Sequence, residues 1–350
     1  MAHVISLAQL GWGQVSPNPL VGAIVVKDGE IIGSGYHARF GDPHAEFVAL
    51  NEAGTRGRGA TLYVNLEPCN HYGKTPPCTK SIIDAGISRV VLAARDPNPV
   101  ASKGAERLRA AGITVDFEVC ESEAREINAA FFNSFKSDRP WVTLKLAVSL
   151  DGSIAPADRT TAMLTNEKSI EAVHRMRAQT DAIAVGAATA AADDPQLTAR
   201  TDPPPRIPPT RIVFDRSARL SAQSKLAKTA TKVPTLVVTG ETTALPADLA
   251  NMGVEGLPAH DLADALRKLK TRGIHSLMVE GGAGLAASFL ASGFVDRLVI
   301  FEAPIILGSG SLNAFSGIAG QTVQDAPRFR VLTSSMLGND IMTTYAVEKA

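Results

Sequence analysis

One histidine and two cysteines in the first half of the chain have the side chains of a zinc site. His44 lies two residues before Glu46, Cys69 follows a proline, and Cys78 comes after eight intervening residues. Three protein ligands leave one tetrahedral position for water, which is the catalytic arrangement of zinc. Glu46 is too close to His44 in sequence to be an easy fourth ligand, but it can move the proton of a bound water. We therefore expect hydrolytic zinc chemistry, with a purely structural zinc site as the alternative.

A glycine-rich turn in the second half is suited to a phosphate group. Residues 276–280 form an apolar run that ends in Glu280, and Gly281, Gly282 and Gly284 follow before the run 285–290. Backbone N–H groups at the start of a helix bind phosphate, and glycines permit close approach. Glu302, at the end of the next apolar run, is a possible ribose partner. On pattern alone, a plain tight turn remains the alternative.

The elements that must position the first site alternate between strands and helices. We expect a hairpin over 23–37, a helix from about 43, strands over 60–66, 90–94 and 113–119, and helices over 81–87, 105–112 and 122–135. Cys120 is expected on the last of these strands, as a core residue. The polar stretch 136–140 then interrupts the pattern, so the domain boundary is placed between 138 and 139.

A second alternating unit is expected from residue 139 to 350. Its strands are predicted over 141–152, 182–186, 211–215, 235–238, 276–280 and 297–303, and its helices over 166–179, 262–270 and 286–293. The proline-rich segment 202–209 reads as an extended surface loop. The fold class is thus α/β, with two domains in 350 residues.

Composition excludes several classes of function. The chain has 35 Lys and Arg against 35 Asp and Glu, so its formal net charge is zero, and only 5% of its residues are aromatic. Binding to nucleic acid normally needs a basic surface, so we expect no nucleic-acid partner. No uncharged run reads as a membrane span, and three cysteines make a disulfide framework improbable. A cytoplasmic location is the default expectation.

The motifs of the first half resemble a known family. HAE and LEPCNHYGKTPPC, preceded by SPNPLVGAIVVKDG and followed by DPNP, closely resemble the deaminase half of the bifunctional riboflavin-biosynthesis deaminase/reductases. The resemblance implies a cytidine-deaminase-like α/β/α domain with zinc on His44, Cys69 and Cys78, and Glu46 as the proton shuttle. It places the substrate contacts at Asn18, His37, His71, Lys74, Asp96 and Asn98.

The second half resembles the reductase half of the same family through LKLAVSLDG, RAQTDAIAVGAATAAADDPQLTAR and VEGG. This implies a dihydrofolate-reductase-like α/β domain that uses NADPH. The implied cofactor contacts are Ala147, Met163, Thr189, Asp193, Arg216, Gly282, Ala283, Gly284, Leu285, Ala286, Ala287 and Ser288. The implied substrate contacts are Thr161, Arg177, Leu197, Arg200 and Glu280.

Four basic side chains of this half have proposed tasks. Two arginines, Arg177 and Arg200, suit a phosphate monoester, because the guanidinium forms paired, charge-assisted bonds with it. Arg216, after the strand 211–215, is placed to meet the 2′-phosphate of the cofactor. Lys145 is the candidate for orienting or protonating the ribose oxygen, with a strand lysine whose head reaches the surface as the alternative.

The expected function is therefore bifunctional and uses zinc and NADPH. Deamination of 2,5-diamino-6-(5-phosphoribosylamino)pyrimidin-4-one comes first, and reduction of its ribosyl group to ribityl follows. The alternative is a zinc deaminase of another pyrimidine or of a nucleic-acid base with a non-catalytic nucleotide-binding domain. The expected partners are the small phosphoribosyl pyrimidine substrate and further copies of the chain in a homo-oligomer, without nucleic acid or membrane.

Overall fold

The computed structural model describes residues 1–72, 76–117, 119–161, 163–320 and 322–348. The chain divides into two compact units, Met1–Ser137 and Asp138–Ala350. Within the described residues, no helix has both the length and the apolar character needed to cross a membrane.

A mixed five-stranded sheet forms the centre of the first unit. Its order is β2-β1-β3-β4-β5; β1 runs antiparallel to both β2 and β3, and β3, β4 and β5 are parallel. The strands are β1 (Gly22–Lys27), β2 (Glu30–Tyr36), β3 (Thr61–Leu66), β4 (Arg89–Ala94) and β5 (Thr114–Asp116). Alternating buried side chains such as Leu62 and Val64 fill the core on one face of this sheet.

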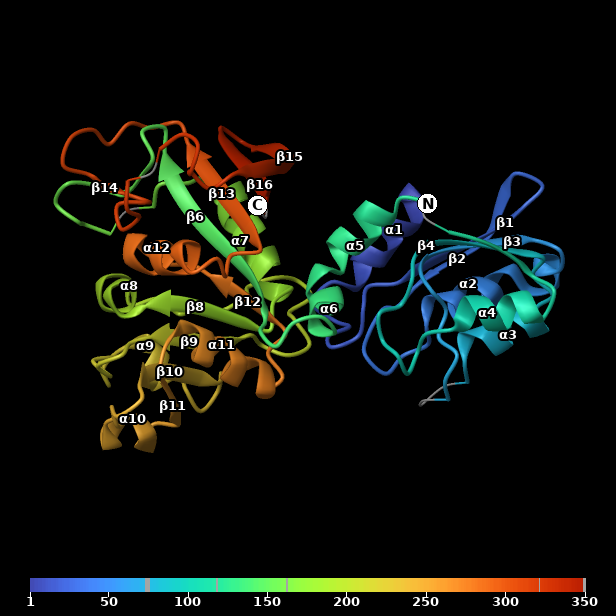
Figure 1. The fold of residues 1–350 in the computed structure, drawn as a ribbon, viewed down its shortest axis with the longest axis horizontal. Helices are drawn as coiled ribbons and strands as arrows, with labels where there is room; N and C mark the ends of the chain where they lie inside the picture. Colours follow the sequence, from blue (N-terminus) through green and yellow to red (C-terminus); the bar gives the residue numbers. More distant parts are fainter. Residues whose placement is uncertain (73–75, 118, 162, 321, 349–350) are drawn as a thin grey trace. The chain divides into compact units, whose positions relative to one another are not determined.

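Helices cover both faces of this sheet (Figure 1), with α1 and α5 on one side and α2, α3 and α4 on the other. The helices are α1 (Ala2–Ala8), α2 (Ala45–Ala53), α3 (Cys78–Asp84), α4 (Gly104–Ala110), α5 (Glu121–Ile127) and α6 (Ala129–Ser134), with 3-10 turns at Gln9–Gly11 and Gly54–Gly57. Glycines let α2 approach its strands closely, because a Cβ on Gly35 would lie 2.6 Å from the carbonyl oxygen of Ala45.

Two expectations for the end of this unit are wrong. The single helix expected over 122–135 is broken at Asn128, whose buried amide accepts a hydrogen bond from the Leu20 N–H and donates one to the Leu20 carbonyl. These hydrogen bonds hold the loop that contains Leu20, and the helix is interrupted at Asn128. Cys120 does not lie on a strand: it precedes α5 with a φ of 60° and is only partly buried.

The second unit contains a nine-stranded sheet of order β11-β10-β9-β8-β12-β6-β13-β16-β15. Neighbouring strands from β11 to β13 are parallel, and the β15–β16 hairpin continues the sheet in antiparallel fashion. The strands are β6 (Trp141–Ser149), β8 (Ala182–Gly186), β9 (Thr210–Phe214), β10 (Thr235–Gly240), β11 (Val254–Ala259), β12 (Ser276–Val279), β13 (Arg297–Ala303), β15 (Phe329–Leu337) and β16 (Asp340–Val347); β7 (Ser153–Ala155) pairs with β14 (Leu312–Asn313).

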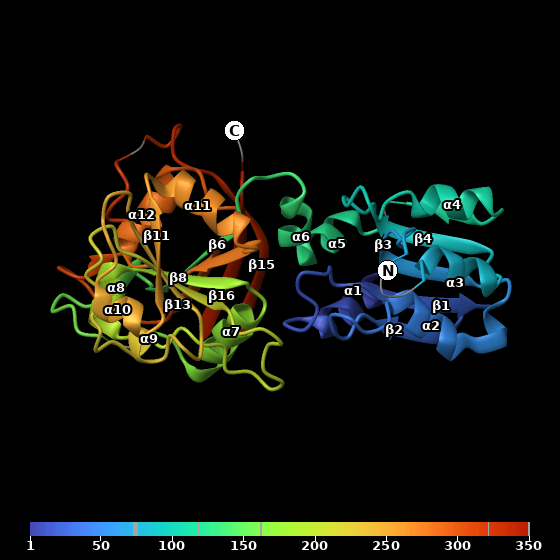
Figure 2. The same ribbon diagram turned by 90° about the horizontal axis from the view of Figure 1, so that it is seen from below.

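Figure 2 shows this sheet between two layers of helices, α11 and α12 on one face and α7 to α10 on the other. They are α7 (Glu167–Ala178), α8 (Ala187–Asp193), α9 (Lys225–Lys228), α10 (Ala247–Asn251), α11 (Leu262–Thr271) and α12 (Ala283–Ala291). Leu266 and Phe289 pack with Leu144 on the first face, and Leu226 packs with Val213 on the second. The parallel strands all end at one edge of the sheet, where loops are free to carry function.

Candidate active sites

His44, Cys69 and Cys78 form a cluster in the first unit. Their ligand atoms all lie within 4.8 Å of one another, with His44 Nδ1 3.2 Å from Cys78 Sγ and 3.6 Å from Cys69 Sγ. His44 directly precedes α2, Cys78 is the first residue of α3, and Cys69 lies in the loop that follows β3. Three different elements thus converge on one point.

The electrostatics of the cluster favour metal binding. The hydrogen bond from Cys78 lowers the pKa of the Cys69 thiol to about 4, and the backbone N–H of Cys78 donates to the same sulfur at 3.3 Å. The thiolate is the form of cysteine that ligates metal. One imidazole and two thiols are a donor set that zinc prefers, so these residues fit the ion.

Glu46 lies one residue into α2, on the side of the cluster, and is buried. Burial raises the pKa of its carboxyl to about 7, and the negative charge of Cys69 acts in the same direction. A carboxyl that titrates near neutral pH can both accept and donate a proton. Glu46 therefore lies beside the cluster, where the sequence predicted a proton-transfer group.

The cluster opens into a cavity of about 310 Å³. Five of the residues that the family resemblance assigns to substrate line it together with His44, Glu46 and Cys69: Asn18, His37, His71, Asp96 and Asn98. Among the described residues, Nδ1 of His71 is buried without a hydrogen-bond partner, so it is available to a ligand. Lys74, the sixth assigned residue, lies outside the described residues.

Glu67 also lines this cavity and was not identified from the sequence. Its two carboxylate oxygens accept hydrogen bonds from the N–H groups of Asp96 and Ala105, at 3.2 and 2.9 Å. Glu67 thereby holds the loop that carries Asp96, whose carboxyl pKa is raised to about 6 by burial first and also by the charge of Glu67. The only sequence signal was its place directly before Pro68 and Cys69 in the LEPC segment.

A larger cavity, of about 1330 Å³, lies in the second unit. It is lined by all the expected substrate residues of this half and by most of the expected cofactor residues: Lys145, Ala147, Thr161, Met163, Arg177, Thr189, Asp193, Leu197, Arg200, Arg216, Glu280, Gly282, Ala283, Gly284, Leu285 and Ser288. Ala286 and Ala287 are not among the lining residues: Ala286 lies in the hydrophobic core and Ala287 is buried next to Gly317. Glu302, on β13, is likewise absent from the described lining.

Arg177 and Glu280 form an ion pair beside Lys145. Arg177 Nε and Nη2 donate to the two Glu280 oxygens at 2.6 and 2.8 Å, and its Nη1 donates to the Thr198 carbonyl at 3.1 Å. The pair lowers the pKa of the buried Glu280 carboxyl, and burial lowers the pKa of Lys145. Lys145 is partly buried and lines the cavity, and its Nζ lies 5.4 Å from the centroid of the Phe301 ring. Arg177 is held by a carboxylate, which leaves Arg200 as the less engaged of the two arginines.

The glycine turn and α8 meet at the N-terminus of α12. The N–H of Gly282 donates to Thr189 Oγ1 at 3.1 Å, and a Cβ on Gly282 would come 2.9 Å from that same oxygen. Two further lining residues also contact each other, since Thr161 Oγ1 donates to Asp193 Oδ1 at 2.9 Å. The lining Met163 side chain is 73% exposed, so it is accessible to a ligand.

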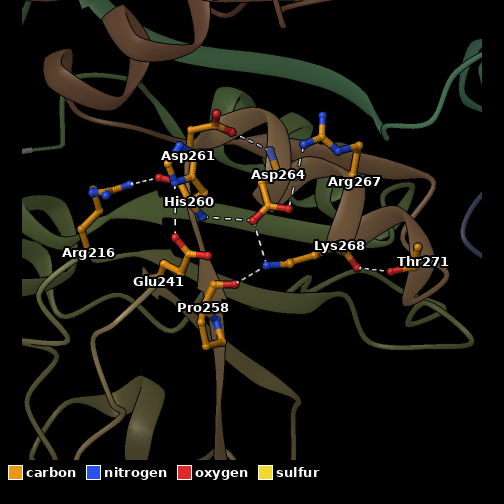
Figure 3. Close-up of polar contacts among 9 residues, drawn as sticks. All are labelled: Arg216, Glu241, Pro258, His260, Asp261, Asp264, Arg267, Lys268 and Thr271. Atoms are coloured by element: carbon orange, nitrogen blue, oxygen red, sulfur yellow. Dashed lines mark hydrogen bonds and ion pairs between the residues drawn. The ribbon is translucent and has the colours of Figure 1, made fainter.

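Arg216 lines this cavity and follows the end of β9, and Figure 3 shows its side chain next to His260. Its Nη1 donates to the His260 carbonyl at 3.0 Å. Asp261 caps α11 by accepting from the Asp264 N–H, and Asp264 accepts from the N–H of His260 and from Lys268. Arg216 is thus tethered to the residue before the cap of α11, and within the described residues its other guanidinium donors have no hydrogen-bond partner.

Comparison with known protein families matches both halves of the chain. Residues 1–94 match the cytidine and deoxycytidylate deaminase zinc-binding region, and residues 140–343 match the RibD C-terminal domain. The fold is therefore a cytidine-deaminase-like zinc-binding unit followed by a dihydrofolate-reductase-like unit, as the sequence predicted. The RibD reductases use NADPH, and the deaminase region binds zinc.

Full-length relatives show the same arrangement. The chain is 44% identical to the riboflavin biosynthesis protein RibD of Aquifex aeolicus over 98% of this chain and 96% of that protein. It is 37% identical to RibD of Escherichia coli over 97% of this chain and 96% of that protein. A crystal structure from Thermotoga maritima, described as a diaminohydroxyphosphoribosylaminopyrimidine deaminase/5-amino-6-(5-phosphoribosylamino)uracil reductase, superposes with a TM-score of 0.87 at 38% identity and covers 99% of this chain and 97% of its own.

Acinetobacter baumannii RibD also superposes with a TM-score of 0.87, at 35% identity over 99% of this chain and 98% of its own. Both units, and not one alone, are thus shared with these proteins over nearly their whole length. This chain belongs to the RibD family of riboflavin-biosynthesis proteins, which are bifunctional deaminase/reductase enzymes.

Proposed function

We propose that this chain deaminates 2,5-diamino-6-(5-phosphoribosylamino)pyrimidin-4-one and then reduces the ribosyl group of the product to ribityl. The observation that carries the proposal is the pairing of two equipped cavities in one chain. One cavity holds the His44, Cys69 and Cys78 cluster with Glu46, and the other holds Lys145 beside the glycine turn. The description of the Thermotoga maritima relative names these substrates.

We assign the deaminase to residues 1–138 and the reductase to residues 139–350. The two family matches, at 1–94 and 140–343, fall on either side of this boundary. Each compact unit also has a hydrophobic core of its own. Each activity can therefore be removed without disturbing the other.

In the deaminase half, His44, Cys69 and Cys78 would hold zinc, which would supply Lewis-acid activation of a water molecule. As the water oxygen bonds to the ring carbon, Glu46 takes one water proton on a carboxylate oxygen and passes it to the adjacent ring nitrogen. The second proton then passes by way of Glu46 to the amino nitrogen, the C–N bond breaks, and ammonia leaves. The Glu46 pKa of about 7 suits both steps. The burial of Glu46 excludes bulk water from this proton transfer.

Substrate binding in this half is assigned to the residues that line the cavity. Asn18, His71, Asp96 and Asn98 offer hydrogen-bond donors and acceptors to the pyrimidine and its ribose. Lys74, in the Gly-Lys-Thr segment, is assigned to the phosphate as a point charge. His37 lines the same cavity.

In the reductase half, NADPH supplies the hydride when it is bound. The charge of Glu280 favours the protonated form of Lys145, whereas burial and the charge of Arg177 disfavour it. Lys145 orients or protonates the ribose oxygen. Arg200 contacts the phosphate of the substrate, while Thr161 and Leu197 complete the substrate side of the cavity. Arg177 contributes its own charge to substrate binding, and it also holds the Glu280 carboxylate through two hydrogen bonds.

Cofactor binding is assigned to other residues that line this cavity. The N-terminus of α12 and the glycine turn suit the pyrophosphate, and Arg216 suits the 2′-phosphate. The assigned contacts are Ala147, Met163, Thr189, Asp193, Arg216, Gly282, Ala283, Gly284, Leu285 and Ser288. Ala286 and Ala287 belong to α12 but do not line the cavity, so their cofactor contacts stay predictions.

The partners follow from this assignment. The net charge of zero supports a small-molecule substrate over nucleic acid. A cytoplasmic location and a homo-oligomeric state stay predictions; sedimentation of the purified protein tests the second.

Paired variants test the two assignments. Glu46→Gln should remove ammonia release while zinc content and NADPH oxidation with deaminated substrate stay at the wild-type level. Lys145→Met should remove NADPH oxidation and leave ammonia release unchanged. Unchanged deamination by zinc-loaded Glu46→Gln contradicts the first assignment. If Lys145→Met still oxidises NADPH at the wild-type rate, the assignment of Lys145 is wrong.

A further inference from the structure

His37 is a buried side chain held between two polar groups of the deaminase unit. Only 3% of the residue is exposed. Its Nδ1 lies 3.2 Å from the carbonyl oxygen of Pro43, and its Nε2 lies 3.1 Å from Nδ2 of Asn18. Both ring nitrogens are therefore engaged by the protein itself.

The carbonyl of Pro43 determines which ring nitrogen carries the proton. A carbonyl oxygen only accepts hydrogen bonds, so Nδ1 of His37 must be the N–H. In a neutral imidazole the other nitrogen, Nε2, is then an acceptor. The amide group of Asn18 that faces Nε2 must be the donor, which is its NH₂ group, as the structure shows.

The consequence for Asn18 is a fixed amide orientation. With Nδ2 directed to His37, the carbonyl oxygen Oδ1 is on the other branch of the amide. Within the described part of the chain, Oδ1 has no hydrogen-bond partner, and Asn18 lines the cavity beside the metal cluster. A free Asn amide can present either its oxygen or its nitrogen by rotating half a turn, but this one cannot rotate without losing the bond to His37.

We propose that His37 is a positioning residue of the deaminase, which orders the Asn18 amide so that Oδ1 accepts a hydrogen bond from an N–H edge of the pyrimidine. The proposal rests on the deaminase function proposed above and deepens it. His37 then acts on the substrate through Asn18 and makes no polar contact of its own, because neither ring nitrogen is left over. The site selects substrates that offer a donor, and not an acceptor, at this position.

A second possible task for His37 must be separated from this one. Its ring packs edge-to-face against the ring of His44, with centroids 5.5 Å apart and an interplanar angle of 73°. Pro43, the acceptor of the Nδ1–H, directly precedes His44. His37 could thus serve only as a support for the metal ligand, and zinc content is the readout that reveals such a role.

The first test is spectroscopic and independent of turnover. ¹⁵N-labelled, zinc-loaded full-length protein is examined by two-bond ¹H–¹⁵N correlation, and the His37 signals are assigned by their loss in His37→Gln. We expect a neutral ring with a proton on Nδ1 and a bare Nε2. A proton on Nε2 overturns the proposal. This outcome can be read even in a protein that fails to release ammonia, so it is distinguishable from failure of the proposed function.

The second test is a double-mutant cycle on the kcat/KM of deamination with His37→Leu and Asn18→Ala. We expect His37→Leu to lower kcat/KM about tenfold, or about 1.4 kcal/mol, in the wild-type background. In the Asn18→Ala background it should have less than a twofold effect, because the amide that it orders is gone. Equal, additive effects in both backgrounds overturn the proposal, since they indicate that His37 acts independently of Asn18.

Two controls accompany the cycle. NADPH oxidation with deaminated substrate should be unchanged in all variants, because the reductase unit contains neither residue. Zinc content should be at the wild-type level as well. If the whole loss in His37→Leu follows from lost zinc and is restored by added zinc, His37 supports His44 only, and the proposal is wrong.

Discussion

The Arg177–Glu280 ion pair gives the sharpest prediction for the reductase unit. The change is Glu280→Gln, which keeps the shape of the side chain and removes its charge. The two side chains are only 14% and 11% exposed. The variant leaves the Arg177 guanidinium without a counter-charge in a site where burial already disfavours charged groups.

The size of the effect follows from this burial. Breaking a buried pair by removing one partner costs about 3 to 5 kcal/mol. Because glutamine retains one oxygen acceptor for Arg177, we expect the lower end, about 3 kcal/mol. For a unit of this size, that loss lowers the melting temperature by about 6 to 12 °C. Lys145 also loses a nearby negative charge, so its pKa falls further and NADPH oxidation should drop about 10²-fold.

A second buried pair in the same unit provides the matched control. Arg139 donates to both oxygens of Asp296 at 2.6 and 2.8 Å, and these side chains are 15% and 5% exposed. Neither residue lines the larger cavity in the described part of the chain. Asp296→Asn should therefore cost a similar amount of stability while the reductase rate, measured well below the melting temperature, stays within twofold of the wild type.

Two assays are needed: scanning calorimetry of the whole protein and initial rates of NADPH oxidation. In the calorimetry, the unfolding transition of the reductase unit is identified by its shift when NADPH is added. An unchanged melting temperature in Glu280→Gln would refute the energetic reasoning. Equal loss of activity in Glu280→Gln and Asp296→Asn would refute the link between Glu280 and Lys145. The double variant Arg177→Met/Glu280→Met should regain stability without regaining activity, because it removes both charges.

Three further predictions concern pH, metal and packing. In the folded state the pKa of Glu280 is lowered from 4.5. The ionised Glu280 side chain therefore stabilises the fold above pH 4.5, and this contribution is lost as the pH falls through the lowered pKa. The difference in melting temperature between the wild type and Glu280→Gln should narrow below about pH 4.5. Removal of zinc by a chelator should abolish ammonia release and leave NADPH oxidation with deaminated substrate intact. Adding zinc back should restore ammonia release. Gly104→Ala should weaken zinc binding in a competition titration, because the new Cβ would lie 1.9 Å from the carbonyl oxygen of Pro68, the residue before Cys69. Gly57→Ala is the control and should leave zinc binding unchanged, because its Cβ would lie 3.7 Å from the nearest atom, the Cβ of Ala53.

Local patterns were sufficient to predict the metal cluster and the alternating elements. His44, Cys69 and Cys78 were selected by residue type, and the structure brings their ligand atoms within 4.8 Å. The strands 182–186 and 297–303 have apolar runs bounded by turns, and the structure contains them as β8 and β13 with the same bounds. Signals of this kind depend on neighbours in the chain.

The features that sequence reasoning missed depend on contacts distant in the chain. The β15–β16 hairpin has mostly half-exposed side chains, so it lacks the apolar run by which other strands were found. Asn128 breaks a helix for a partner 108 residues away. The burial of Ala286 depends on which face of α12 meets the hydrophobic core, and Ala287 lies next to Gly317, 30 residues away in the chain. The roles of Glu67 and His37 rest on hydrogen bonds to Ala105 and Asn18 that no spacing rule reveals.

The central claim is that one chain carries both activities in sequence. The most direct measurement incubates zinc-loaded protein with the diaminopyrimidine phosphate substrate and follows ammonia release and NADPH absorbance together, with and without NADPH. The account predicts ammonia release in both conditions, and NADPH consumption of one equivalent for each ammonia when the cofactor is present. Ammonia without NADPH consumption, or no ammonia from the zinc-loaded protein, would contradict it.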